Sequence, residues 1–195
     1  MTDENTLWLL SFYRSSEISG ALFFGRLAGV LCDSPIQRDL SRHFAEESQH
    51  AWYWTRCIDE LGAKPLRLDA AYQDRYLAAA GIPANLMEVL ALTQVFEQRV
   101  IRQYAVHSRL RGMSPIIRAT LLRIMQDEKW HVRWVREALE SMAREHGRPA
   151  VEQARRRFLA ADAEVFRSTY REHAERVQHI FDHTGGSGPW TTRNS

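Results

Sequence analysis

The 195-residue sequence has few cysteines, no long apolar run and little net charge. Its two cysteines, Cys32 and Cys57, form no CxxC motif, which excludes a zinc ribbon or a rubredoxin-type site. The formal net charge of +2 gives no strong electrostatic reason to expect binding to nucleic acid. The most apolar run, residues 18–32, is too short to span a membrane and contains Arg26. These absences favour an ordinary soluble globular protein.

The beginning and the end of the chain also lack particular signals. Residues 1–5 carry acidic rather than basic side chains, so no secretion signal is indicated and a cytoplasmic location is expected. A chain of this length is expected to form a single domain, here residues 1–183. Residues 184–195 begin with a glycine-rich stretch, which predicts a flexible C-terminal tail.

Apolar residues recur every three or four positions through most of the sequence, and no β-hairpin signal interrupts them. This periodicity predicts an all-α fold. A short helix is also expected at about 69–80, within a long connection at 63–83. The five long helices are expected at about residues 6–31, 35–61, 85–110, 114–147 and 150–183.

The lengths of the connections predict how these helices are arranged. Tight turns join the first helix to the second and the third to the fourth, so each pair is expected to be antiparallel. The 63–83 connection could reach roughly 60 Å if extended, enough to run back along the bundle. The second and third helices would then begin at the same end. The two cysteines would lie near opposite ends of the first hairpin, so no disulfide is expected.

Two Glu-x-x-His motifs are present, Glu47–His50 in the second helix and Glu128–His131 in the fourth. Residues three apart lie on one face of a helix, and both motifs interrupt an otherwise apolar face. A buried carboxylate without a partner is very unfavourable. Each motif is therefore expected to meet other polar groups inside the bundle.

The first and third helices each carry one glutamate, Glu17 and Glu97, on a similar apolar face. Glu17 precedes Glu47 by 30 residues and Glu97 precedes Glu128 by 31, so all four helices place these side chains at one level. Four carboxylates and two imidazoles in one core would be balanced by two divalent cations. Such a mixed ligand set suits iron or manganese, and zinc to a lesser degree.

Other interpretations stay open at this point. Chance alone supplies about 0.6 Glu-x-x-His motifs in a chain of this composition, so a helical interaction module with a polar core is an alternative. Tyr13 and His43, one turn before Glu17 and Glu47, either support the site or pack in the core. Glu46 and Asp127 point elsewhere by angle, although a ligating histidine needs such a partner. Several residues either wall a substrate pocket or belong to the core: Trp54, Phe96, Tyr104, Met125 and Trp134.

On the six residues of these motifs, the chain resembles the ferritin-like di-iron carboxylate superfamily over residues 6–146. The resemblance implies a ferritin-like four-helix bundle with a long crossover between helices two and three, to which this chain adds a C-terminal fifth helix. It also implies that Glu47 and Glu128 bridge two metal ions and that His50 and His131 each bind one ion. Glu17 and Glu97 would be terminal ligands.

Within the superfamily, the sequence differs from two groups. Bacterioferritins place a haem-binding methionine beside the second-helix motif, where this chain has Ser48, and rubrerythrins add a glutamate on helix three, where Gln94 stands. The size, the fifth helix and the symmetric ligand set are more similar to the small oxygenases. Those are the ubiquinone-pathway hydroxylases, the tRNA hydroxylase and the aldehyde-deformylating oxygenase.

The resemblance therefore implies a non-haem di-iron oxygenase or oxidase. Its cofactors would be two Fe ions, or Mn or mixed Fe/Mn, with O2 as co-substrate and a small organic molecule as the substrate to be oxidised or hydroxylated. An external reductase would supply electrons, because no flavin or nicotinamide motif is present. A ferroxidase or iron-storage protein is the alternative. A homodimer is expected, since large exposed apolar stripes are usually covered.

Overall fold

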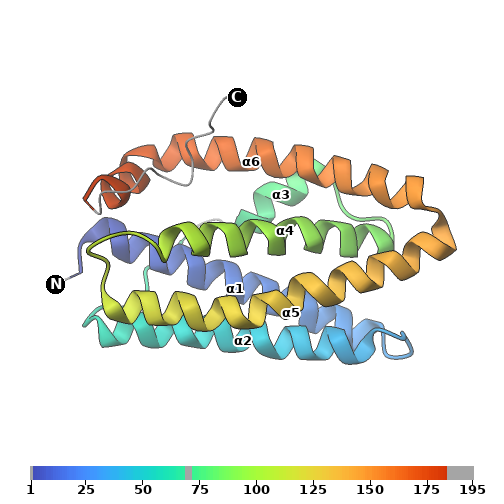
Figure 1. Cartoon of the computed structure of the whole chain (residues 1–195), viewed down its shortest axis with the longest axis horizontal. Helices are drawn as coiled ribbons and strands as arrows, with labels where there is room; N and C mark the ends of the chain where they lie inside the picture. Colours follow the sequence, from blue (N-terminus) through green and yellow to red (C-terminus); the bar gives the residue numbers. More distant parts are fainter. Residues whose placement is uncertain (1, 69–71, 184–195) are drawn as a thin grey trace.

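The computed structural model describes residues 2–68 and 72–183, and every regular element in this part of the chain is an α-helix (Figure 1). The expected all-α helical bundle is confirmed. The predicted tail, residues 184–195, lies outside the described residues. The helices are α1 (Glu4–Val30), α2 (Gln37–Glu60), α3 (Tyr72–Ala80), α4 (Leu86–His107), α5 (Pro115–His146) and α6 (Arg148–His183).

Two helical hairpins, α1 with α2 and α4 with α5, form the centre of the bundle. The predicted boundaries hold to within a few residues. The first helix begins two residues earlier than predicted, because the Asp3 carboxylate accepts a hydrogen bond from the Thr6 amide (2.9 Å) and caps it. Gly62, with a φ of 73°, follows the end of α2 as predicted. Helix α4, which corresponds to the third predicted long helix at 85–110, ends at His107, three residues before the predicted end.

The connection between the hairpins runs back along the bundle, so that α2 and α4 begin at the same end (Figure 1). The short helix expected at 69–80 is present as α3, Tyr72–Ala80. Tyr76 fixes α3 to α6, because its buried hydroxyl donates a hydrogen bond to the Phe158 carbonyl (2.5 Å). The long crossover thus carries a helix that covers the bundle between α1 and α6.

The predicted fifth helix is α6, which follows α5 after the single residue Gly147. That glycine has a φ of 86°, a conformation that other residues rarely adopt, and it lets the chain reverse direction. The helix packs on α4, α3, α5 and α1, with a kink at His173. One face of α6 is therefore covered by the chain's own bundle.

A layer of polar residues divides the apolar core into two clusters. One cluster surrounds Phe24, Leu90 and Phe158, and the other surrounds Trp54 and Leu121. Burying each such side chain contributes roughly 1.5–3 kcal/mol, and the two clusters hold the four central helices against the polar layer between them. None of the described helices is both long and apolar enough to cross a bilayer.

Candidate metal centre

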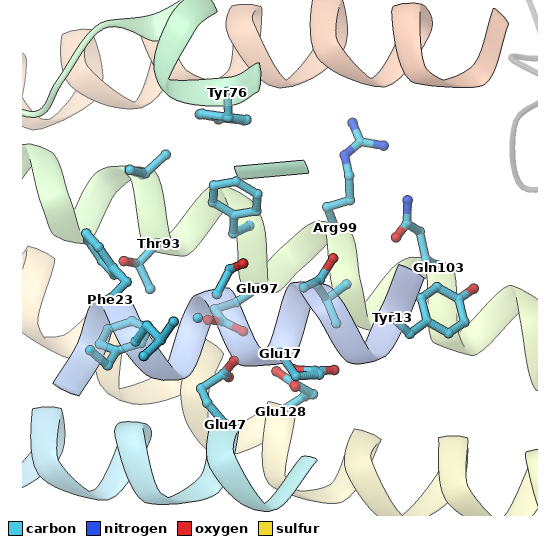
Figure 2. A pocket seen from close by; sticks show the side chains of 18 of the residues that line it. Tyr13, Glu17, Phe23, Glu47, Tyr76, Thr93, Glu97, Arg99, Gln103 and Glu128 are labelled. Carbon is cyan, nitrogen blue, oxygen red and sulfur yellow. The ribbon is translucent and has the colours of Figure 1, made fainter. Parts of the chain in front are cut away.

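The polar layer contains all six residues that the sequence singled out. They come from four helices: Glu17 from α1, Glu47 and His50 from α2, Glu97 from α4, and Glu128 and His131 from α5. All six are at most 6% exposed. Figure 2 shows the four carboxylates directed toward one another from the four helices. The structure therefore brings the whole predicted set together at one level of the bundle.

One group of potential ligands consists of Glu17, Glu47, His50 and Glu128, whose donor atoms all lie within 4.8 Å of one another. His50 Nδ1 is 3.3 Å from Glu128 Oε1 and 3.7 Å from Glu17 Oε2. Neither ring nitrogen of His50 makes a hydrogen bond in the described part of the chain, although the ring is completely buried. An imidazole nitrogen that faces two carboxylates without bonding to them fits a cation placed between the three groups.

The second group contains His43, Glu47, Glu97 and His131, again within 4.8 Å. His131 Nδ1 is 3.1 Å from Glu128 Oε2 and 3.6 Å from Glu97 Oε2. Glu47 belongs to both groups, and Glu128 directs one oxygen to His50 and the other to His131. These two glutamates thus lie close to residues of both groups.

His43 is the member whose role the sequence left open. Its Nε2 lies 3.2 Å from Glu47 Oε1 and 3.2 Å from Glu97 Oε1. Trp134 donates its indole N–H to His43 Nδ1 at 3.1 Å. Because indole nitrogen is only a donor, Nδ1 must be the unprotonated nitrogen, and the ring proton is on Nε2. His43 therefore donates to the carboxylates, and this tautomer has no lone pair on Nε2 for a metal ion.

The outer nitrogens of the other two histidines face carboxylates from the opposite hairpin. His131 Nε2 is 3.1 Å from Glu46 Oε2, and His50 Nε2 is 3.5 Å from Asp127 Oδ2. Each acidic residue directly precedes the glutamate of one motif and reaches the histidine of the other. Such a partner fixes the orientation of a ligating imidazole. The structure thus places Glu46 and Asp127 beside the histidines, the role that the sequence had left open.

The pKa values of Glu47 and His50 are strongly perturbed. Burial raises the pKa of Glu47 well above its usual range, and the nearby carboxylates of Glu17 and Glu97 add to the effect. Burial also disfavours the charged form of His50, but Asp127, Glu128 and Glu17 outweigh it and hold its pKa well above normal. Carboxylates that repel one another and imidazoles that are drawn toward protonation both fit a site built for positive charge. Oxygen and imidazole donors together suit iron or manganese.

Glu17 has a different environment from the other glutamates. Tyr104 donates a hydrogen bond to Glu17 Oε1 (2.5 Å), and Trp54 Nε1 lies 3.2 Å from the Tyr104 hydroxyl and 3.4 Å from the same carboxylate oxygen. The Tyr13 hydroxyl lies 3.3 Å from His107 Nδ1, and its ring packs against Tyr104. Of the two interpretations of Tyr13, packing in the core is the one that the structure supports.

Gly20 is a functional position that the sequence interpretation missed. A Cβ at this position would lie 2.3 Å from Glu47 Oε2, so a larger residue would require the shared carboxylate to move. The available signal was a glycine in the middle of a helix, where it is unfavourable, three residues after Glu17 on the same face.

A cavity of about 330 Å³ adjoins the centre, and the carboxylates of Glu17, Glu47, Glu97 and Glu128 form part of its wall. Of the aromatic and methionine residues considered as pocket walls, Phe96 and Tyr104 line it. Trp54 packs in the core, as does Trp134, and Met125 packs against it. An organic molecule in this cavity would touch the candidate metal ligands directly.

Comparison with known proteins adds no family to this description. No protein-family model matches the chain, and a search of curated proteins likewise finds no match. Function is therefore inferred from the chemistry of the site, and the ferritin-like assignment stays a resemblance carried by six residues.

Proposed function

We propose that the chain is a ferritin-like di-metal carboxylate oxidoreductase that uses O2 to oxidise or hydroxylate a small organic substrate. This proposal rests on one observation: the candidate metal ligands also form part of the wall of a cavity. Two groups of ligands that share Glu47 could hold a pair of ions, and the same carboxylates line a cavity of organic size. Two iron ions are the favoured cofactor, with manganese or a mixed pair as variants.

The ligand roles follow from the geometry together with the resemblance. Glu47 and Glu128 would bridge the ions, His50 and His131 would each bind one, and Glu17 and Glu97 would complete the two ends. Four carboxylates would then balance four positive charges inside an otherwise apolar core. The ions would supply the redox chemistry and a place for O2, with electrons delivered by a separate reductase.

The remaining residues of the centre hold this ligand set in place. Glu46 and Asp127 fix the planes of the two ligating imidazoles from outside. His43 and Tyr104 donate hydrogen bonds to carboxylates on opposite sides of the centre, so those oxygens keep their positions when substrate enters. The apolar walls of the cavity exclude water from the reacting groups.

Two alternatives use the same residues differently. A ferroxidase or iron-storage protein would need the two ions but no cavity for an organic molecule, and the 330 Å³ cavity therefore favours an oxidase or oxygenase. A non-enzymatic helical module would leave both buried ring nitrogens of His50 without a hydrogen bond in the described part of the chain, which is unfavourable without a cation. A homodimer and a cytoplasmic location remain predictions.

Metal analysis of freshly purified protein tests the proposal, together with optical spectra before and after anaerobic reduction and exposure to O2. We expect about two iron or manganese ions per chain and an absorption band that depends on O2. Far more than two ions would support storage instead. No ions, even after reconstitution with Fe(II) or Mn(II), would overturn the proposal.

A further inference from the structure

The cavity beside the metal centre lies between the two hairpins. Helix α1 packs closely on α2, and α4 packs closely on α5, whereas α1 and α4 face each other across the cavity. Tyr76 and Leu77 of α3 and Thr169 of α6 contribute to the wall on the side away from the carboxylates. Figure 2 shows the glutamates on one side of this space and Tyr76 on the other.

The cavity is long for its volume. Its lining on α1 extends from Phe12 to Arg26, roughly 21 Å along the helix at about 1.5 Å per residue. A volume of about 330 Å³ spread over that length leaves room for a slender chain rather than a broad ring system. The apolar part of its lining consists of Phe12, Leu22, Phe23, Phe24, Leu92, Phe96 and Val100.

Two apolar side chains that line the cavity are also exposed to solvent. Leu22 of α1 is 59% exposed and Leu77 of α3 is 38% exposed, and both line the cavity. Exposed leucines that also line the cavity favour contact with an apolar molecule, because its surface leaves water when it packs against them.

A polar position interrupts these walls at α6. Thr169 lines the cavity and is 7% exposed, yet its hydroxyl has no hydrogen-bond partner in the described part of the chain. A buried hydroxyl is normally paired, so this one is available for a group on a bound molecule. Two longer polar side chains that line the cavity, Arg99 and Gln103, extend from α4 on its α6 side (Figure 2).

The positive charge of Arg99 is already balanced by Asp162. Arg99 Nε lies 2.7 Å and 2.8 Å from the two carboxylate oxygens of Asp162, and Asp162 is itself buried. The guanidinium also stacks on the Phe166 ring at 3.8 Å. An anionic ligand would have to compete with Asp162 for Arg99, whereas a neutral oxygen needs only the free hydroxyl of Thr169.

We propose that the cavity binds a slender, mostly apolar molecule that carries a neutral hydroxyl or carbonyl oxygen. That oxygen bonds to the Thr169 hydroxyl, and the apolar chain lies along α1 and passes the carboxylates. The hydrogen bond sets which carbon faces the metal centre. This assignment of substrate class rests on the proposed function, but binding itself needs no turnover.

Calorimetric titration of the full-length, purified chain with octan-1-ol, octan-2-one and octane-1-sulfonate tests the proposal. The three probes share an eight-carbon chain and differ in the charge of the polar end, and the sulfonate is a weak metal ligand. We expect the alcohol and the ketone to bind at least ten times more tightly than the sulfonate. Thr169→Val should weaken binding of the alcohol by about five- to tenfold, and Thr169→Ser should restore it.

Two further variants locate the bound molecule. Val100→Phe extends a side chain that already lines the cavity and should abolish binding, whereas Leu159→Phe changes an exposed residue of α6 that does not line it and should have no effect. Sulfonate binding as tight as the alcohol, unchanged binding in Thr169→Val, or no binding of either neutral probe would overturn the proposal. If the chain held no metal ions but still bound the neutral probes, the cavity assignment would be supported and the proposed function would be wrong.

Discussion

The two ligand groups share Glu47, and each adds one terminal glutamate, Glu17 or Glu97, and one motif histidine, His50 or His131, but different neighbours hold them. On the Glu17 side, Tyr104 and Trp54 donate to the terminal carboxylate. On the Glu97 side, the donor is a third histidine, His43. All three donors are buried aromatic side chains, yet only the histidine has a nitrogen that resembles a metal ligand.

That difference shows why residue type and distance alone do not define a ligand set. His43 lies as close to the carboxylates as His131 does and completes a group of four potential ligands. Its other nitrogen decides its role. His131 presents Nε2 to the Glu46 carboxylate, which accepts a hydrogen bond, whereas His43 presents Nδ1 to the Trp134 N–H, which donates one. To decide whether a histidine in such a site binds the ion, the hydrogen-bond partner of its outer ring nitrogen must also be known.

Removing the shared carboxylate should have the largest effect. Glu47→Ala is expected to lose both ions, because Glu47 belongs to both groups. His50→Ala should lose only the ion of the Glu17 side, and the exposed Glu60→Ala on the same helix should keep two. Metal content per chain measures all three. Retention of both ions by Glu47→Ala would contradict the shared role.

The two outer carboxylates allow the ion sites to be weakened one at a time. Glu46→Gln should weaken the ion held by His131, and Asp127→Asn the ion held by His50, in the range of roughly 10–100-fold. The effect of Glu46→Gln should be the larger, because its contact is 3.1 Å and that of Asp127 is 3.5 Å. Titration against a competing chelator measures both affinities. If both variants lost the same ion, the pairing of Glu46 with His131 and of Asp127 with His50 would be wrong.

Gly20→Ala tests whether the shared carboxylate needs an empty space beside α1. The new Cβ would lie 2.3 Å from Glu47 Oε2 and push it from the centre, so metal affinity should fall by roughly tenfold or more. Gly29→Ala is the matched control on the same helix, with no atom within 4 Å of its Cβ. It should leave metal affinity unchanged and stabilise the fold by about 0.5–1 kcal/mol. Equal metal affinity in the two variants would argue against the close approach.

Replacing His43 separates a supporting donor from a ligand. His43→Phe should keep two ions per chain and weaken the Glu97-side ion by about tenfold, because a carboxylate loses one hydrogen bond. His43→Gln, which retains an N–H donor, should recover most of that affinity. Nitrogen couplings in pulsed electron paramagnetic resonance spectra should report two ligating imidazoles in wild type and in both variants. Loss of one ion from His43→Phe would make His43 a ligand.

The sequence alone was sufficient to predict the helices and the six converging side chains, because both depend on local spacing. Glu17 and Glu97 were identifiable from their position on apolar faces at equal distance from a turn. The first hairpin and the crossover followed from connection lengths. The ends of α1 and α4 were displaced because capping contacts, such as Asp3 with Thr6, compete with the periodic pattern.

What could not be predicted depends on contacts between distant segments. The tautomer of His43 is set by Trp134, 91 residues away, and no spacing rule connects the two. Gly20 matters only because α2 brings Glu47 against it. The cavity arises because α1 and α4 are held apart by their own partners, so Trp54 and Trp134, which the same helical spacing suggested as pocket walls, pack in the core instead.

Replacing His107, which lies next to Tyr13, should have the smallest effect on metal affinity. His107 lies behind Tyr13, and burial lowers its pKa from 6.5 to about 4. The unfolded chain therefore binds one more proton than the folded chain between these two pH values. Stability from this group is fully present above pH 6.5 and is lost as pH falls toward 4, by on the order of 3 kcal/mol in total.

His107→Gln should remove that pH dependence, because glutamine does not titrate. The free energy of unfolding by urea, measured from pH 7 to pH 4, should fall more steeply for wild type than for the variant. At pH 7 both proteins should hold two ions with similar affinity, since His107 hydrogen-bonds to Tyr13, which is not a candidate ligand. Parallel pH profiles would mean that His107 becomes protonated in the folded chain without cost. The aromatic residues near Glu17, Tyr13 and Tyr104, would then be accessible to solvent, unlike the buried residues around Trp134.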